Sequence, residues 1–102
     1  MSFEEKVVPV EGITILDLST VLSGPASTML LADQGARVIK VESSDGDLTR
    51  QMGIRKGSLS TAFININRGK QSLSVDLKTS QGRQIIEELA KNCDVSVQNF
   101  RP

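Results

Sequence analysis

Histidine is absent from this sequence, and cysteine occurs only once. Without histidine the chain lacks the commonest general base and the commonest metal ligand in proteins. A single cysteine, Cys93, forms neither an intrachain disulfide nor a cysteine-rich zinc site. Cys93 is interpreted as a small buried apolar residue, and such cysteine usage fits a reducing compartment, so we predict a cytoplasmic protein with no metal.

An excess of charge and a long hydrophobic run are also missing. Lys and Arg together number 12, as do Asp and Glu, and this balance argues against a nucleic-acid partner. The apolar runs are too short to span a membrane, and acids stand where a signal peptide carries bases. With 102 residues, 38% of them hydrophobic and 24% charged, the composition suits one small globular domain.

Alternating strand-like and helix-like segments fill the first part of the chain. Residues 13–18 and 37–42 are short, apolar and β-branched, as buried strands are. Between them, residues 26–34 carry a helical pattern, with Pro25 at the helix start and Gly35 after its end. This order predicts a βαβ unit with parallel strands and a right-handed crossover.

The second part repeats this order after an interruption. Residues 43–60 are rich in Ser, Gly and Asp and predict a long polar surface loop, whereas residues 61–66 leave strand and helix open. Residues 72–77 and 94–98 then predict strands on either side of a helix capped by Thr79 or Ser80. The fold class is therefore α/β with Rossmann-like βαβ units and a mainly parallel sheet, which is incomplete because no helix follows its last strand.

Ligands of open parallel sheets bind beyond the carboxyl ends of the strands, which here are followed by residues 19–25, 42–50 and 99–102. The first segment contains one glycine and is not a dinucleotide fingerprint, so a tight turn and an anion site both remain open. A polyphosphate would favour the nearby bases, although a solvated surface position is the favoured reading for each of them. These bases are Arg50, Arg55, Lys56, Arg68, Lys70 and Lys78.

The aspartates provide no catalytic centre in this reading. They are Asp17, Asp33, Asp45, Asp47, Asp76 and Asp94. Asp17 and Asp76 lie in apparent strands near polar turns, where hydrogen bonding to loop amides is the favoured role. No nucleophile–base pair is found, and we therefore predict no catalytic residue within the chain.

A series of motifs in family order nevertheless resembles family III CoA-transferases. The matching stretches are residues 12–19 (GITILDLS), 22–26 (LSGPA), 30–42 (LLADQGARVIKVE), 46–50 (GDLTR), 67–70 (NRGK), 75–79 (VDLKT), 82–83 (GR) and 94–102 (DVSVQNFRP). The likeness runs from about Pro9 to Pro102. It implies that residues 1–102 are the amino-terminal part of a Rossmann-like, CoA-binding domain.

The resemblance also implies which residues contact CoA. The positions that match are Val21, Leu22, Ser23, Ser43, Arg50, Val75, Lys78, Asn99 and Phe100. Lys78 would suit a phosphate and Val75 the adenine, whereas Ser43 stands where some relatives carry an adenine-contacting arginine.

Transferases of this family use an aspartate nucleophile to move CoA between an acyl-CoA and a small carboxylic acid, and they form interlocked homodimers. None of the six aspartates here matches that nucleophile, so this chain alone is expected to be inactive. A fragment of an α-methylacyl-CoA racemase is the alternative within the family. A non-catalytic CoA- or nucleotide-binding module and a gene remnant are the alternatives outside it.

Overall fold

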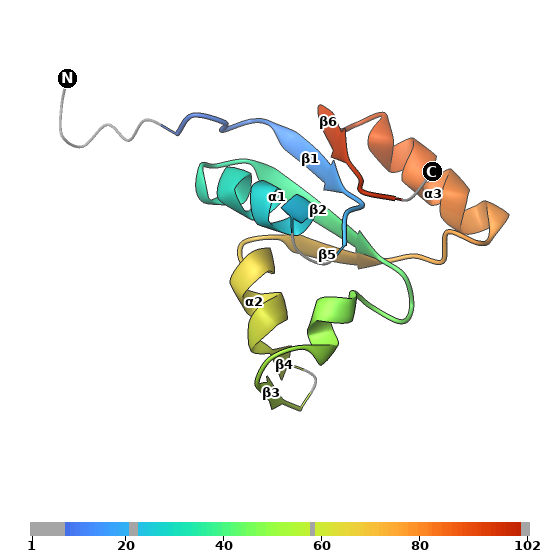
Figure 1. The fold of residues 1–102 in the computed structure, drawn as a ribbon. Coiled ribbons are helices and arrows are strands. Elements are labelled where there is room, and N and C mark those ends of the chain that lie inside the picture. The colour runs from blue at the N-terminus through green and yellow to red at the C-terminus, as the bar shows by residue number, and fades with distance from the viewer. Residues whose placement is uncertain (1–7, 21–22, 58, 101–102) are drawn as a thin grey trace, which may run out of the picture.

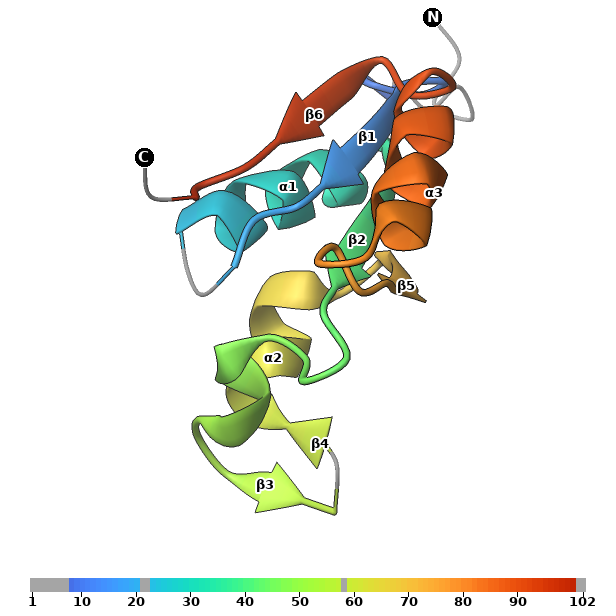
Figure 2. The same cartoon turned by 90° about the vertical axis from the view of Figure 1, so that its right-hand side faces the viewer.

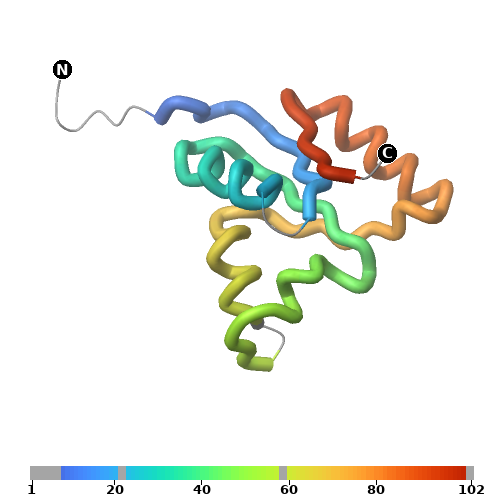
Figure 3. Tube along the Cα trace, in the orientation of Figure 1, coloured from blue at the N-terminus to red at the C-terminus, as the bar shows by residue number. Residues whose placement is uncertain are grey.

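The computed structural model describes residues 8–20, 23–57 and 59–100, and its centre is a four-stranded parallel sheet (Figure 1). The strands are β1 (Thr14–Asp17), β2 (Arg37–Glu42), β5 (Gln71–Ser74) and β6 (Val95–Val97). Their order is β5-β2-β1-β6, so β6 lies beside β1 and not beside β5 (Figure 3). The predicted α/β class with a parallel sheet is confirmed.

Two helices connect the strands and cover opposite faces of the sheet. Helix α1 (Ser23–Asp33) joins β1 to β2, and helix α3 (Ser80–Ala90) joins β5 to β6. Figure 2 shows the two helices on either side of the strands. Helix α1 begins three residues before the predicted helix, with Pro25 in its first turn. Gly35 follows its end with φ +106°, a conformation that side chains disfavour.

The hydrophobic core has two layers because successive strand residues point to opposite faces. On the α1 face, Ile15 and Val38 pack with Leu31 and neighbouring apolar side chains. On the α3 face, Leu16 packs with a second apolar group. That group contains Val41, Val75, Leu73, Leu77, Ile86, Leu89 and the half-buried Cys93, in agreement with the interpretation of this cysteine as an apolar core residue.

The segment 43–60 is more structured than the expected surface loop. It contains the 3₁₀ helix η1 (Leu48–Gln51) and an antiparallel pair of short strands, β3 (Arg55–Lys56) and β4 (Leu59–Ser60). Helix α2 (Thr61–Asn67) follows directly, so the choice left open for this segment resolves to helix. The Ser60 hydroxyl caps α2 by accepting a hydrogen bond from Phe63 N–H at 3.3 Å. These elements lie below the sheet in Figure 1.

No helix in the described part of the chain is both long enough and apolar enough to cross a membrane.

Candidate functional site

A pocket of about 120 Å³ lies at the edge where the parallel strands end. We name it the edge pocket, and its lining residues are Leu18, Thr20, Val41, Glu42, Ser43, Gly46, Asp47, Leu77 and Phe100. They come from the ends of β1, β2 and β6 and from the loop after β5. The pocket therefore lies at the edge of the sheet where ligands of open parallel sheets are expected.

Two of the sequence-predicted residues, Ser43 and Phe100, line the edge pocket. Val75 is buried beneath it, in the apolar group that also contains Val41 and Leu77. Lys78 follows Leu77 and is exposed. Two of the predicted residues therefore line the pocket, and their contact with CoA stays a prediction.

Two other predicted residues, Ser23 and Asn99, follow strand ends at this edge. Ser23 is exposed at the start of α1, while Val21 and Leu22 fall outside the described residues. The side chain of Asn99 bonds the main chain of Thr20 instead of pointing away from the fold.

Most of the lining residues were missed in the sequence, although each lies near a predicted strand end. Leu18, Val41 and Leu77 carry no polar group and matched no motif as ligand contacts. The signal that could have identified them is their position within a few residues of a predicted strand end, because residues at several strand ends together line the pocket.

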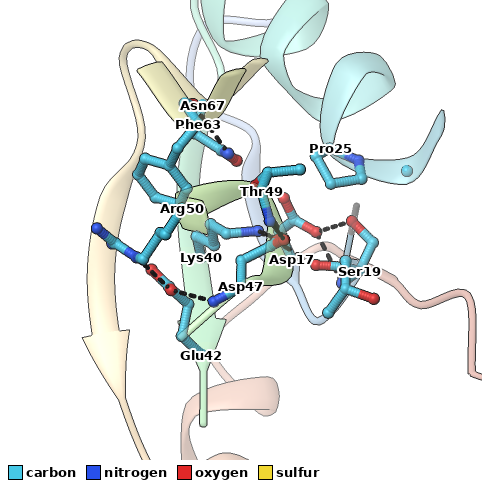
Figure 4. Close-up of polar contacts among 12 residues, drawn as sticks. Asp17, Ser19, Pro25, Lys40, Glu42, Asp47, Thr49, Arg50, Phe63 and Asn67 are labelled. Carbon is cyan, nitrogen blue, oxygen red and sulfur yellow. Dashed lines mark hydrogen bonds and ion pairs between the residues drawn. The ribbon is translucent and has the colours of Figure 1, made fainter. Parts of the chain in front are cut away.

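Beside the edge pocket, a buried ionic cluster occupies the α1 face of the sheet (Figure 4). Asp17 and Lys40 are direct partners in the β1–β2 register and follow Ile15 and Val38 by two positions, so they point to the same face. Each of them forms an ion pair with a residue from a different loop. The cluster therefore ties several loops to the sheet.

Asp17 pairs with Lys70 at 2.9 Å, and both side chains are almost fully buried. The carboxylate also accepts hydrogen bonds from Thr28 Oγ1 at 2.7 Å and from the hydroxyl and the N–H of Ser19. Burial alone would raise the pKa of Asp17, but these hydrogen bonds and the charge of Lys70 hold it below its usual range. Asp17 is thus an ionised structural anchor, consistent with the role favoured from the sequence.

Lys40 pairs with Asp47 at 2.9 Å and donates a second hydrogen bond to the Ser19 carbonyl at 3.2 Å. The side chains of Lys40 and Asp47 are 2% and 0% exposed. Asp47 also accepts from Thr49 N–H at 3.0 Å and from Thr49 Oγ1 at 2.9 Å. Lys40 therefore links the loop after β1 to the loop after β2, and these two loops form neighbouring walls of the edge pocket.

Arg50 is directed towards Glu42. Its guanidinium donates to both carboxylate oxygens, at 2.8 and 2.7 Å, and lies 3.7 Å from the centre of the Phe63 ring. The hydrogen bonds from Arg50 hold the pKa of Glu42 below its usual range against the effect of burial. The edge of Arg50 that remains open faces a second hollow of about 240 Å³, which Ser43 also lines.

The basic residues that the sequence suggested as a phosphate-binding group therefore have different surroundings in the structure. Arg50 and Lys70 bind carboxylates of the chain itself, and Arg68 pairs with Asp33 at 2.7 Å. Lys78 forms no ion pair with any residue in the described ranges. Of these four cations, only the side chain of Lys78 has no carboxylate partner among the described residues, and Lys78 directly follows Leu77, which lines the edge pocket.

Within residues 8–20, 23–57 and 59–100, no three His, Cys, Asp or Glu side chains gather into a group that could hold a metal ion.

Comparison with known proteins agrees with the fold and with the motif series. The sequence profile of CoA-transferase family III matches residues 10–102. Human succinyl-CoA:glutarate CoA-transferase is 49% identical over 98 residues, which are 94% of this chain and 22% of that protein. Acetyl-CoA:oxalate CoA-transferase of Acetobacter aceti is 43% identical over 95 residues, which are 92% of this chain and 24% of that protein.

Solved structures show the same relation. The crystal structure of a CAIB/BAIF family protein from Brucella suis superposes with a TM-score of 0.86 at 37% identity, over 93% of this chain and 26% of that one. Rv3272 from Mycobacterium tuberculosis superposes with a TM-score of 0.83 at 40% identity, over 92% of this chain and 26% of that one. The chain thus spans about a quarter of the length of these relatives and contains only part of their fold. This chain belongs to CoA-transferase family III.

Proposed function

We propose that this chain binds CoA at the edge pocket, as the CoA-binding part of a transferase that moves CoA between an acyl-CoA thioester and a small carboxylic acid. The observation that carries the proposal is a pocket with apolar walls at the carboxyl edge of a parallel sheet, whose lining residue Leu77 is followed by Lys78, a cation that pairs with no carboxylate in the described part of the chain. The names of the relatives, which pair a CoA thioester with glutarate or oxalate, support the substrate classes.

The walls of the edge pocket suit the adenine of CoA. Phe100 is 53% exposed, so its ring is available for stacking, and Leu18, Val41 and Leu77 provide an apolar surface opposite polar Ser43. A flat heteroaromatic base gains from stacking on an aromatic ring and from leaving water. Lys78, next to Leu77, is the cation that we assign to a phosphate.

The carboxylates of the pocket are paired in a way that removes much of their repulsion of an anionic ligand. Two carboxylates, Glu42 and Asp47, line the pocket, and a phosphate would be repelled if they were unpaired. Arg50 and Lys40 neutralise them from within the fold. Neither pocket carboxylate is therefore an unpaired negative charge facing a phosphate, and the acid next to Lys78 is the exposed Asp76, which accepts a hydrogen bond from Lys78 N–H at 3.0 Å.

Acyl transfer needs a carboxylate that attacks the thioester carbonyl and expels the CoA thiolate, with a mixed anhydride as the product on the enzyme. Asp47 lines the pocket and Asp17 lies in the adjoining ionic cluster, but both are buried and already bound to lysines. Hydrogen bonds and cationic neighbours hold the pKa of each below its usual range even though burial opposes this. We therefore assign CoA binding to this chain and assign the nucleophile to none of its aspartates.

The proposal is tested by calorimetric titration of the full chain with CoA and with dephospho-CoA. Phe100→Ala is expected to weaken CoA binding about tenfold or more, because base stacking contributes about 1–3 kcal/mol. Lys78→Ala is expected to remove the preference for CoA over dephospho-CoA if Lys78 holds the 3′-phosphate.

Lys91→Ala is the matched control, because Lys91 follows the carboxyl end of α3, at the other edge of the sheet. Its binding should equal that of the unaltered chain. The proposal is wrong if the unaltered chain shows no heat of binding at millimolar CoA. It is also wrong if Phe100→Ala binds CoA as tightly as the unaltered chain.

A further inference from the structure

The pairing of β1 with β6 continues through a side chain after the strands themselves have ended. The last residues in register are Asp17 and Val97, and Leu18 N–H then bonds the Val97 carbonyl at 2.8 Å. Two residues further on, the Asn99 amide donates to the Thr20 carbonyl at 2.8 Å and accepts from Thr20 N–H at 3.0 Å. The amide thus replaces the peptide group of a neighbouring strand.

The contact between Asn99 and Thr20 requires a side chain with both a hydrogen-bond donor and an acceptor, as an amide has. Thr20 presents one main-chain donor and one main-chain acceptor, and the Asn99 side chain offers one of each in a fixed plane. Aspartate at this position would keep the acceptor but lose the donor. A reversed amide would place donor against donor and acceptor against acceptor, so the orientation of the group is determined by its partner.

The contact joins two walls of the edge pocket. Thr20 lines the pocket from the β1 side and Phe100 lines it from the β6 side. Asn99 is covalently linked to Phe100 and hydrogen bonded to Thr20, so it sets the spacing between them. Phe100 N–H is held as well, since it donates to Gln98 Oε1 at 2.6 Å.

We propose that Asn99 is a positioning residue, which holds the loop after β1 against the end of β6 and thereby shapes the CoA pocket. The inference rests on the proposed function for its ligand, but the structural contact can be tested without any ligand. The resemblance to the family implies that Asn99 contacts CoA. The hydrogen bonds of its amide instead indicate that it positions Thr20 and Phe100.

The ligand-free test is amide hydrogen exchange, measured by NMR on the ¹⁵N-labelled full chain. Asn99→Ala removes the acceptor of Thr20 N–H, so the exchange rate of that amide should rise about tenfold, as expected for one lost hydrogen bond. Asn92→Ala is the control, because the Asn92 amide also donates to a backbone carbonyl, that of Glu88 at 3.1 Å, at the other edge of the sheet. Exchange at Thr20 should be the same in Asn92→Ala and in the unaltered chain.

The second readout is the CoA dissociation constant in a double-mutant cycle with Phe100→Ala. Asn99→Ala alone should weaken CoA binding about tenfold, the equivalent of the loss of one or two hydrogen bonds. If Asn99 acts by placing the Phe100 ring, Asn99→Ala should matter less in a chain that already carries Phe100→Ala. In that background it should weaken CoA binding less than threefold, which is about half of the tenfold effect on the logarithmic scale.

Two results would overturn the proposal. One is an unchanged exchange rate at Thr20 in Asn99→Ala, which would show that the amide does not hold this loop. The other is a tenfold loss in both backgrounds of the cycle, which is the signature of a direct contact with CoA. If the unaltered chain does not bind CoA, the proposed function falls, and the exchange at Thr20 alone decides whether Asn99 positions the loop.

Discussion

Replacement of the buried Lys40 by methionine should destabilise this fold more than a typical single substitution. The Lys40 ammonium and the Asp47 carboxylate are 2.9 Å apart, and their side chains are 2% and 0% exposed. Methionine keeps much of the side-chain volume but removes the charge, so that the buried Asp47 carboxylate loses the ammonium that contacts its Oδ2. The loss of one partner from a buried pair typically costs about 3–5 kcal/mol.

This loss is large compared with the stability of a small domain, which is about 5–15 kcal/mol in total. Lys40→Met combined with Asp47→Asn also removes the buried negative charge but keeps a side-chain oxygen for the hydrogen bonds from Thr49, so the double variant should recover most of the loss. The single and double variants therefore separate the effect of the buried carboxylate charge from the effect of the altered packing.

The assay is urea unfolding followed by far-ultraviolet circular dichroism, which suits a chain without tryptophan or tyrosine. Lys91→Met is the control, because the Lys91–Glu88 pair at 3.1 Å is 70% and 65% exposed and should contribute less than about 1 kcal/mol. A loss below about 1 kcal/mol in Lys40→Met would refute the reasoning. An equal loss in the single and double variants would refute it as well, since packing would then explain the effect.

Two further predictions follow from the cluster and from helix α3. The folded pKa of Asp17 lies below its ordinary value of 3.8, so its contribution to stability is fully present above that pH and is lost as the pH falls through the folded pKa. Urea unfolding between neutral pH and pH 3 should therefore show a smaller acid-dependent loss in Asp17→Asn than in the unaltered chain, and equal losses would contradict this. Gly82→Ala should destabilise the fold by about 1–3 kcal/mol, because the added Cβ would lie 1.9 Å from the Asp76 carbonyl oxygen. Exposed Ser80→Ala in the same turn is its control and should change the stability by less than about 0.5 kcal/mol; similar stabilities of the two variants would show that α3 does not need the close approach.

The periodicity of the sequence was sufficient to predict the architecture. Residues 37–42 form β2 with the predicted bounds, and residues 13–18 and 94–98 contain β1 and β6. These predictions succeeded because burial between helices selects apolar β-branched residues, and this selection is visible locally. The motif series likewise identified the family, which the profile match to residues 10–102 confirms.

Local pattern failed where long-range contacts decide the structure. Residues 61–67 became helix α2 because Ser60 caps it and because it packs against α1 and η1, and neither contact can be read from a seven-residue stretch. In the same way, the loop predicted for residues 43–60 contains the buried Asp47, whose partner Lys40 lies in the separate strand predicted for residues 37–42.

The sequence by itself determined the class of fold and the family. Only the tertiary structure decided which charges are available at the edge where the strands end. Asp17 and Lys70 are 53 positions apart and meet because β5 follows β2 in the sheet, so Lys70 serves the fold and not a ligand. Composition cannot distinguish a paired cation from a free one, since the partner is chosen by strand order and register.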